Sequence, residues 1–112
     1  MNEQSQGTLQ HPKCEMIICI INAGFSETVM DAAKEAGAKG GTVIRGRGTA
    51  NRDAEKIFQI AIQPDKEIVM IIVPEEIRDS VMKAIYDIAG IYKEGQGIVF
   101  SLPVKRTAGL KF

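Results

Sequence analysis

Residues 67–90 read EIVMIIVPEEIRDSVMKAIYDIAG, and this stretch decides the fold. After Glu67 the next six residues are all apolar, which predicts a β-strand over 67–73 that is covered on both faces. Pro74 suits the start of a helix, because its missing N–H would have no partner there in any case. Gly90 predicts the end of that helix. Its expected buried stripe consists of Ile77, Val81, Ala84, Ile85 and Ile88.

The same strand-then-helix pattern occurs at residues 15–37, EMIICIINAGFSETVMDAAKEAG. A continuous apolar run again follows a glutamate, Glu15, and predicts a strand over 15–21. Ser26 is a suitable N-cap for the helix that follows, and Gly37 predicts its end. The apolar positions of this helix are Phe25, Val29, Ala32, Ala33 and Ala36. The chain therefore contains two similar halves.

Shorter segments at 42–44, 56–62 and 98–102 predict further strands, while the charged, glycine-rich segment 45–53 predicts an exposed loop. Two halves of this kind predict an α+β fold: a ferredoxin-like βαββαβ sandwich with a four-stranded antiparallel sheet and two helices on one face. The strands are apolar on both faces, so the face without helices needs a cover. We therefore expect a homo-oligomer.

The length of 112 residues and the hydrophobic share of 45% predict one domain over 14–112, preceded by a flexible leader over 1–13. Fourteen Lys and Arg balance fourteen Asp and Glu, which disfavours binding to a nucleic-acid polymer. The strands also lack the aromatic pair with which such sheets stack RNA bases. Without a long apolar run or a signal-peptide core, the chain is expected to be cytoplasmic and to reach a membrane only through a partner.

Residues for catalysis or metal binding are scarce. The single histidine, His11, lies in the leader, so no Ser/His/Asp set can form, and an enzyme is disfavoured. An enzyme with Glu75 or Asp53 as its base is the minor alternative. The two cysteines are too few for a metal site or a disulfide framework. We expect Cys14 to be exposed and Cys19 to be buried.

Two glycine-rich segments could bind phosphate. Residues 41–49, GTVIRGRGT, combine glycines that let a ligand approach the backbone with arginines that donate in a fork. Gly95-Gln96-Gly97 could form an anion-binding nest before the last strand. Lys105 and Arg106 add cationic donors. The alternatives are a solvated loop, a simple turn and an exposed basic pair.

Taken together, these motifs resemble the PII nitrogen-regulatory signal proteins over about residues 15–106. The resemblance rests on the split βαββαβ order and on four short motifs: residues 37–43, GAKGGTV; 45–48, RGRG; 73–76, VPEE; and Gly95-x-Gly97 before 98–100. It implies a homotrimer whose inter-subunit clefts bind an adenine nucleotide, namely ATP, ADP or AMP, as an effector. It also implies a regulator, not an enzyme, that acts on a target such as a transporter or a regulatory enzyme in nitrogen metabolism.

The resemblance assigns roles to particular residues. The nucleotide-binding residues that it implies are Thr42, Gly46, Arg47, Gly48, Gly95, Gly97, Lys105 and Arg106. The loop over about 45–60 would contact the target protein, through Arg45, Arg47, Arg52 and Phe58. No metal ligand is implied.

The sequence departs from the family pattern at three places. The loop is shorter than usual and has no tyrosine to modify, because the two tyrosines, Tyr86 and Tyr92, lie on or near the second predicted helix. Thr49 and Ala50 stand where typical members have a glutamine that helps bind 2-oxoglutarate. Ile98 replaces a phosphate-binding lysine, which predicts weaker triphosphate binding.

A CutA-like trimeric protein, with a structural or metal-tolerance role, is the alternative of the same architecture. The shortage of histidine and of paired cysteines disfavours its metal-binding role.

Overall fold

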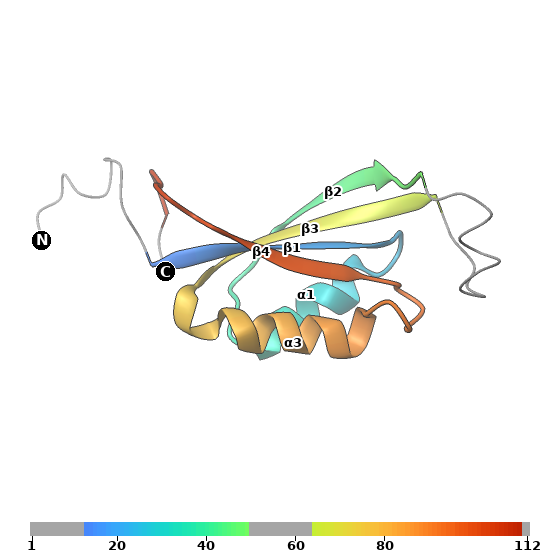
Figure 1. The fold of residues 1–112 in the computed structure, drawn as a ribbon, viewed down its shortest axis with the longest axis horizontal. Coiled ribbons are helices and arrows are strands. Elements are labelled where there is room, and N and C mark those ends of the chain that lie inside the picture. Colours follow the sequence, from blue (N-terminus) through green and yellow to red (C-terminus); the bar gives the residue numbers. More distant parts are fainter. Residues whose placement is uncertain (1–12, 50–63, 111–112) are drawn as a thin grey trace, which may run out of the picture.

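The computed structural model describes residues 13–49 and 64–110. Four strands, two α-helices and one 3-10 turn follow one another along these residues (Figure 1). In chain order they are β1 (Cys14–Asn22), α1 (Ser26–Glu35), β2 (Thr42–Arg47), β3 (Asp65–Pro74), η2 (Glu75–Ile77), α3 (Arg78–Ala89) and β4 (Ile98–Pro103). The leader up to residue 12, the strand expected at 56–62, Arg52 and Phe58 lie outside the described residues.

The strands form one sheet in the order β2-β3-β1-β4, and every neighbouring pair is antiparallel. Both helices lie on the same side of this sheet (Figure 1). The ferredoxin-like sandwich expected from the two sequence halves is confirmed. Within the described residues, no helix has the length and apolar character needed to cross a membrane.

The core lies between the helices and one face of the sheet. Alternate residues of the two central strands, Ile17, Cys19 and Ile21 on β1 and Val69, Ile71 and Val73 on β3, are at most 1% exposed. They pack against Val29, Ala33, Val81, Ile85 and Ala89 of the helices. Burial raises the pKa of the Cys19 thiol to about 12, so this thiol stays protonated and behaves as an apolar side chain.

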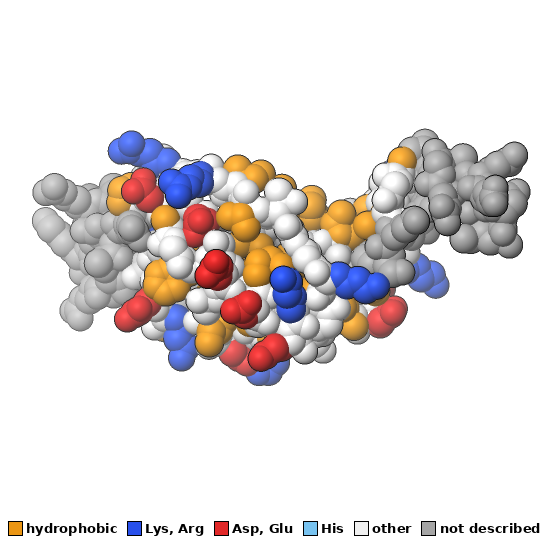
Figure 2. All heavy atoms as spheres, turned by 180° about the vertical axis from the view of Figure 1, so that it is seen from behind, with side chains coloured by type: hydrophobic (Ala, Val, Ile, Leu, Met, Phe, Trp, Pro, Cys, Tyr) orange, Lys and Arg blue, Asp and Glu red, His pale blue; other side chains and the backbone are white. Residues whose placement is uncertain are grey.

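The opposite face of the sheet is also apolar. Ile18 pairs with Met70 and with Phe100, and Ile20 pairs with Ile68 and with Ile98, so these two rows are hydrophobic across β3, β1 and β4. We call this surface the open face; it consists of Met16, Ile18, Ile20, Ile44, Ile68, Met70, Ile72, Ile98, Phe100 and Leu102. Figure 2 shows hydrophobic side chains along the upper edge of the molecule, on the side away from the helices.

The two glutamates that begin the apolar runs have structural partners. The Glu15 carboxylate lies 3.2 Å from the Arg78 guanidinium, which ties the start of α3 to β1. The Glu67 carboxylate accepts a 2.7 Å hydrogen bond from the N–H of Gly24, at the turn between β1 and α1. Glu15 thus joins β1 to α3, and Glu67 joins β3 to the turn between β1 and α1.

The prediction of an exposed loop from residue 45 onward was wrong at its start. β2 continues to Arg47, so Arg45, Gly46 and Arg47 belong to a strand. The register explains the extension, because Arg45 lies opposite Glu67 and Arg47 lies opposite Asp65. Cross-strand pairs of opposite charge stabilise an antiparallel sheet, and the neighbouring strand completes the backbone hydrogen bonds. The alternation of polar and apolar residues that predicts a strand is absent from 45–47, because the two arginines alternate with Gly46.

Helix boundaries also differ from the sequence prediction. Ser26 is the first residue of α1 and makes no side-chain cap; Phe25 is the N-cap residue. Pro74 ends β3, and a 3-10 turn separates it from α3. The buried stripe of α3 is Val81, Ile85 and Ala89, at spacings of four, so Ile88 faces outward and is 50% exposed.

The prediction that Cys14 is exposed was wrong as well. Cys14 is the first residue of β1 and is buried at 4% exposure. It pairs with Pro74, and its carbonyl accepts a hydrogen bond from the N–H of Val104. The last residues of β3 and the segment after β4 therefore enclose it.

Ile85→Ala should lower the free energy of unfolding by about 2–5 kcal/mol, because it leaves a cavity beneath α3. Ile88→Ala removes the same atoms from the exposed side of the helix and should cost less than about 1 kcal/mol. Urea denaturation of both variants measures the difference. Equal losses would mean that α3 is rotated relative to the sheet.

Candidate functional site

The sheet separates the expected nucleotide-binding residues into two groups. Gly97 precedes β4 and Lys105 follows it, and the six residues of β4 span roughly 20 Å. Since β4 is antiparallel to β1, Gly97 lies near Asn22, whereas Lys105 lies beyond the start of β1. We call the end of the sheet at Asn22 the turn end, and the opposite end, at Pro74 and Pro103, the hollow end.

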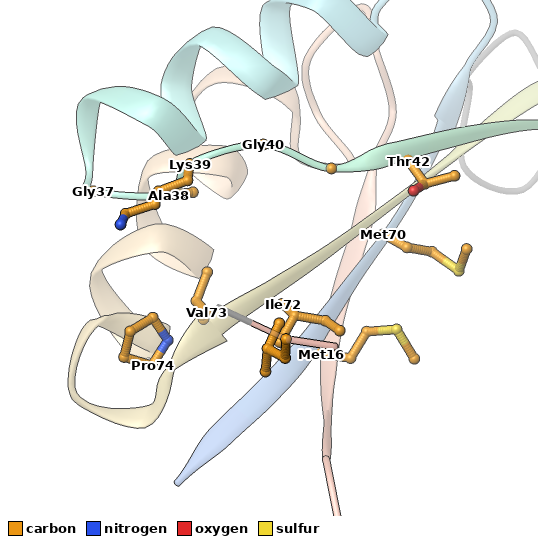
Figure 3. A pocket seen from close by; sticks show the side chains of 12 residues that line it. Met16, Gly37, Ala38, Lys39, Gly40, Thr42, Met70, Ile72, Val73 and Pro74 are labelled. Atoms are coloured by element: carbon orange, nitrogen blue, oxygen red, sulfur yellow. The ribbon is translucent and has the colours of Figure 1, made fainter. Parts of the chain in front are cut away.

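The hollow end takes its name from a cavity of about 470 Å³ beside β3 (Figure 3). β2 begins only at the level of Met70, so the segment that leads into it crosses the last residues of β3 and leaves a hollow. Its apolar side chains include Met16, Met70 and Ile72, and backbone from 37–42 borders it. A flat ring could lie on such a floor, with backbone groups beside its polar edges.

Within the 37–42 segment, Gly41 is needed for close packing. A Cβ on Gly41 would lie 2.7 Å from the Met70 carbonyl oxygen and 2.9 Å from Cγ1 of Ile71. Lys39 is the charged side chain that lines the hollow, and Leu110 reaches it from the segment after β4. Lys39, Met16, Met70 and Leu110 were not among the site residues predicted from the sequence. The signal that could have found Lys39 is its place in the GAKGGTV motif.

At the turn end, residues 93–97 form a tight turn between α3 and β4. The N–H of Gln96 donates to the Lys93 carbonyl at 3.0 Å, and the N–H of Gly97 donates to the Ala89 carbonyl at 2.5 Å. A Cβ on Gly97 would lie 2.7 Å from Cγ2 of Ile21 and would collide with the Ala89 carbonyl. Gly97 is therefore required by the packing of the turn against α3 and β1. Gln96 has a φ of +49°, a conformation that non-glycine residues seldom adopt.

The base of the segment between β2 and β3 lies at the same end. The N–H of Gly48 donates to the Pro64 carbonyl at 2.6 Å, which closes this segment. The side chain of Lys66 passes beneath Gly48, where a Cβ would lie 2.9 Å from Cε of Lys66. The side chains of Arg45 and Arg47 are exposed beside it.

A partly buried polar contact joins these two parts of the turn end. Lys66 Nζ donates to Oδ1 of Asn22 at 2.7 Å, and Nδ2 of Asn22 donates to the Glu94 carbonyl at 2.9 Å. Partial burial lowers the pKa of the Lys66 ammonium. The sequence alone predicted no role for Asn22 or Lys66, because the groups that contact Asn22 lie 44 and 72 residues away along the chain.

The predicted site residues thus fall into two places. Gly46, Arg47, Gly48, Gly95 and Gly97 gather at the turn end, while Thr42, Lys105 and Arg106 lie toward the hollow end. One chain cannot bring the two groups around one small ligand. Within 13–49 and 64–110, no three side chains of His, Cys, Asp or Glu lie close enough together to hold a metal ion.

Gly97→Ala should destabilise the fold by about 1–3 kcal/mol, because the added methyl group must displace the turn from α3. Gly40→Ala is the matched control. Nothing lies within 4 Å of a Cβ at Gly40, so its effect should stay below about 1 kcal/mol. Thermal unfolding compares the two variants. If both unfold at the same temperature as the unsubstituted chain, the close contact at Gly97 does not exist in solution.

Comparison with known proteins agrees with this architecture. Residues 14–111 match the family described as nitrogen regulatory protein P-II. No curated protein matches the chain in sequence. Among solved structures, PII from Arabidopsis thaliana bound to citrate has a TM-score of 0.63 and 24% identity, covering 84% of this chain and 77% of that one.

Two PII-like proteins are similar in fold. CPII from Thiomonas intermedia K12, bound to ADP, AMP and acetate, has a TM-score of 0.65 and 17% identity, covering 90% of this chain and 92% of that one. A putative PII-like signaling protein from Thermus thermophilus has a TM-score of 0.63 and 15% identity, covering 85% and 88%. With the family match spanning nearly all of the described fold, the chain belongs to the nitrogen regulatory protein P-II family.

Proposed function

We propose that this P-II family protein binds an adenine nucleotide in clefts between copies of the chain and passes that signal to a partner protein. The observation that carries the proposal is the separation of the expected binding residues between the two ends of the sheet. A ligand that contacts both groups needs the hollow end of one copy and the turn end of another. The site is complete only in the assembly.

Each end suits a different part of a nucleotide. The hollow, with Met70 and Ile72 on its floor, suits an adenine ring. Lys105 and Arg106 add positive charge at this end. At the neighbour's turn end, the exposed guanidinium of Arg47 suits a phosphate group, which it can bind through two parallel hydrogen bonds.

The similar structures support this choice of ligand. CPII from Thiomonas intermedia K12 is bound to ADP and AMP, and the Arabidopsis thaliana PII structure holds citrate.

Ile98 is the first residue of β4, and its side chain is 57% exposed at the turn end. An isoleucine there offers no charge to a third phosphate. We therefore expect ADP or AMP to bind at least as well as ATP.

The open face supports assembly. Phe100, Leu102, Ile44 and Ile98 are 37–57% exposed in the single chain, on a surface that is apolar over most of its length. Burying such a surface against other copies removes it from water, which is the main driving force for association. A homotrimer is the arrangement that the family implies, with three equivalent clefts.

The partner would be contacted by the segment over about 45–60. Of this segment the structure describes residues 45–49, where Arg45 and Arg47 are exposed at the edge strand β2. We propose a target protein such as a transporter or a regulatory enzyme, a role in nitrogen metabolism and action in the cytoplasm. The protein itself would act as a regulator without catalysing a reaction.

Calorimetry with ATP, ADP, AMP and adenosine tests nucleotide binding. ADP at about one hundred times its dissociation constant should stabilise the fold by about 2.7 kcal/mol. Arg47→Ala should weaken ADP binding about tenfold, because a charge-assisted hydrogen bond is lost. Lys83→Ala, at an exposed lysine of α3 that pairs with Asp87, should leave ADP binding unchanged. Failure of every nucleotide to bind would contradict the proposed ligand class.

The assembly can be tested by sedimentation. The unsubstituted chain should sediment as a trimer, and Phe100→Asp should give monomers, because it places a charge on the apolar open face that the assembly would bury. Tyr92→Asp is the control, since Tyr92 is 89% exposed beyond the end of α3. A monomeric unsubstituted chain that nevertheless binds ADP would rule out a cleft between copies.

A further inference from the structure

Asn22 is the only polar side chain that is buried among the described residues, at 5% exposure. It ends β1 at the turn end, and its hydrogen bonds go to two separate segments. Its backbone N–H donates to the Gly95 carbonyl at 2.8 Å, and its Nδ2 donates to the Glu94 carbonyl at 2.9 Å. Its Oδ1 accepts from Lys66 at 2.7 Å. A buried amide with both ends paired has one fixed orientation.

Lys66 decides that orientation. An ammonium group can only donate hydrogen bonds, so it must face the oxygen of the Asn22 amide. The NH₂ group is then directed at the Glu94 carbonyl, as the 2.9 Å distance shows. A flipped amide would set NH₂ against NH₃⁺ and the amide oxygen against the Glu94 carbonyl, and both contacts would repel.

The same contacts join the turn to the base of the β2–β3 segment. Lys66 pairs in register with Asn22 on one side and with Gly46 on the other, and its stem passes beneath Gly48. The N–H of Ala23 also donates to the Asp65 carbonyl at 3.0 Å. Partial burial of Lys66 removes water from its ammonium, so Asn22 Oδ1 replaces part of its hydration. The 93–97 turn and residues 46–48 are thus held in one frame.

We propose that Asn22 is a positioning residue that holds the 93–97 turn in the conformation that receives nucleotide phosphates, and that Lys66 acts through Asn22 by fixing its amide. This inference rests on the proposed function, because it assigns the turn to the phosphates. If it holds, a change at Asn22 affects the binding of the phosphates at the turn but not the binding of the adenine ring in the hollow. Asn22 itself would not touch the ligand.

The test compares ADP with adenosine, which lacks the phosphates, in three variants. Asn22→Leu removes the donor to Glu94 without adding a charge, Asn22→Asp keeps the partner of Lys66, and Lys66→Met keeps the stem beneath Gly48. Each should weaken ADP binding about tenfold, the usual effect of one lost hydrogen bond in a charged site. Adenosine binding should change less than about twofold, because the hollow is untouched.

Two controls match these changes at exposed positions of α3. Lys83→Met removes a positive charge as Lys66→Met does, and Ser80→Asp adds a negative charge as Asn22→Asp does. Both should bind ADP as the unsubstituted chain does. The double variant Asn22→Leu/Lys66→Met should be no weaker than either single variant, because the two residues act as one unit.

Several outcomes would overturn the proposal. Additive losses in the double variant would mean that Lys66 contacts the ligand directly. A loss with Asn22→Asp but none with Asn22→Leu would mean simple charge repulsion. An equal loss for adenosine would mean that Asn22 only stabilises the fold. If Asn22→Leu does not fold, the comparison of ADP with adenosine in Asn22→Asp and in Lys66→Met still separates a positioning role from a role in stability alone.

Amide hydrogen exchange without nucleotide separates this inference from the proposed function. In the variants that fold, the amides of Gln96 and Gly97 should exchange about tenfold faster, while those of α1 keep their rates. Unchanged exchange at the turn would overturn the positioning role. If the turn loosens but the unsubstituted chain binds neither ADP nor adenosine, Asn22 holds the turn and the proposed function is what fails.

Discussion

The antiparallel pairing of β1 with both β3 and β4 is the constraint on which the rest of this structure depends. It places the end of β1 beside the start of β3 and beside the turn before β4. Three segments that are distant in the sequence therefore meet at Asn22. The same pairing sends the end of β3 and the end of β4 to the opposite side, where the hollow forms. The turn end and the hollow end of the candidate site are therefore both placed by the pairing of β1 with its two neighbours.

The sheet is apolar on both faces, and only one of them is covered by helices. The core side depends on Ile17, Ile71 and Ile85, which lose all contact with water inside the chain. The open face is also apolar, and Ile44, Ile98, Phe100 and Leu102 on it remain 37–57% exposed. A fold of this kind gains most when several copies bury their open faces together. The proposed assembly and the proposed shared cleft would then have one physical cause, because residues at one end of a sheet would meet those at the other end of the next copy's sheet.

The fold could be predicted well from the sequence, because it depends on local patterns. Continuous apolar runs after Glu15 and Glu67 predicted the central strands, and apolar spacings of three and four predicted both helices. The prediction failed where a neighbour decided the outcome. Arg45 and Arg47 extend β2 because Glu67 and Asp65 lie opposite them. Ile88 is exposed, although its spacing allowed burial, because α3 packs through Ala89.

The sequence by itself determined the residue types of the candidate site: glycines before and after short strands, exposed arginines and a basic pair after β4. It also carried the family resemblance, because the order of the short motifs along the chain can be seen without a structure. Only the tertiary structure decided which of these residues share an end of the sheet, and that Asn22 is a buried bridge. Its partners Lys66 and Glu94 lie 44 and 72 residues away. Strand pairing and the turn before β4 bring these groups within hydrogen-bonding distance, and no local pattern in the chain records it.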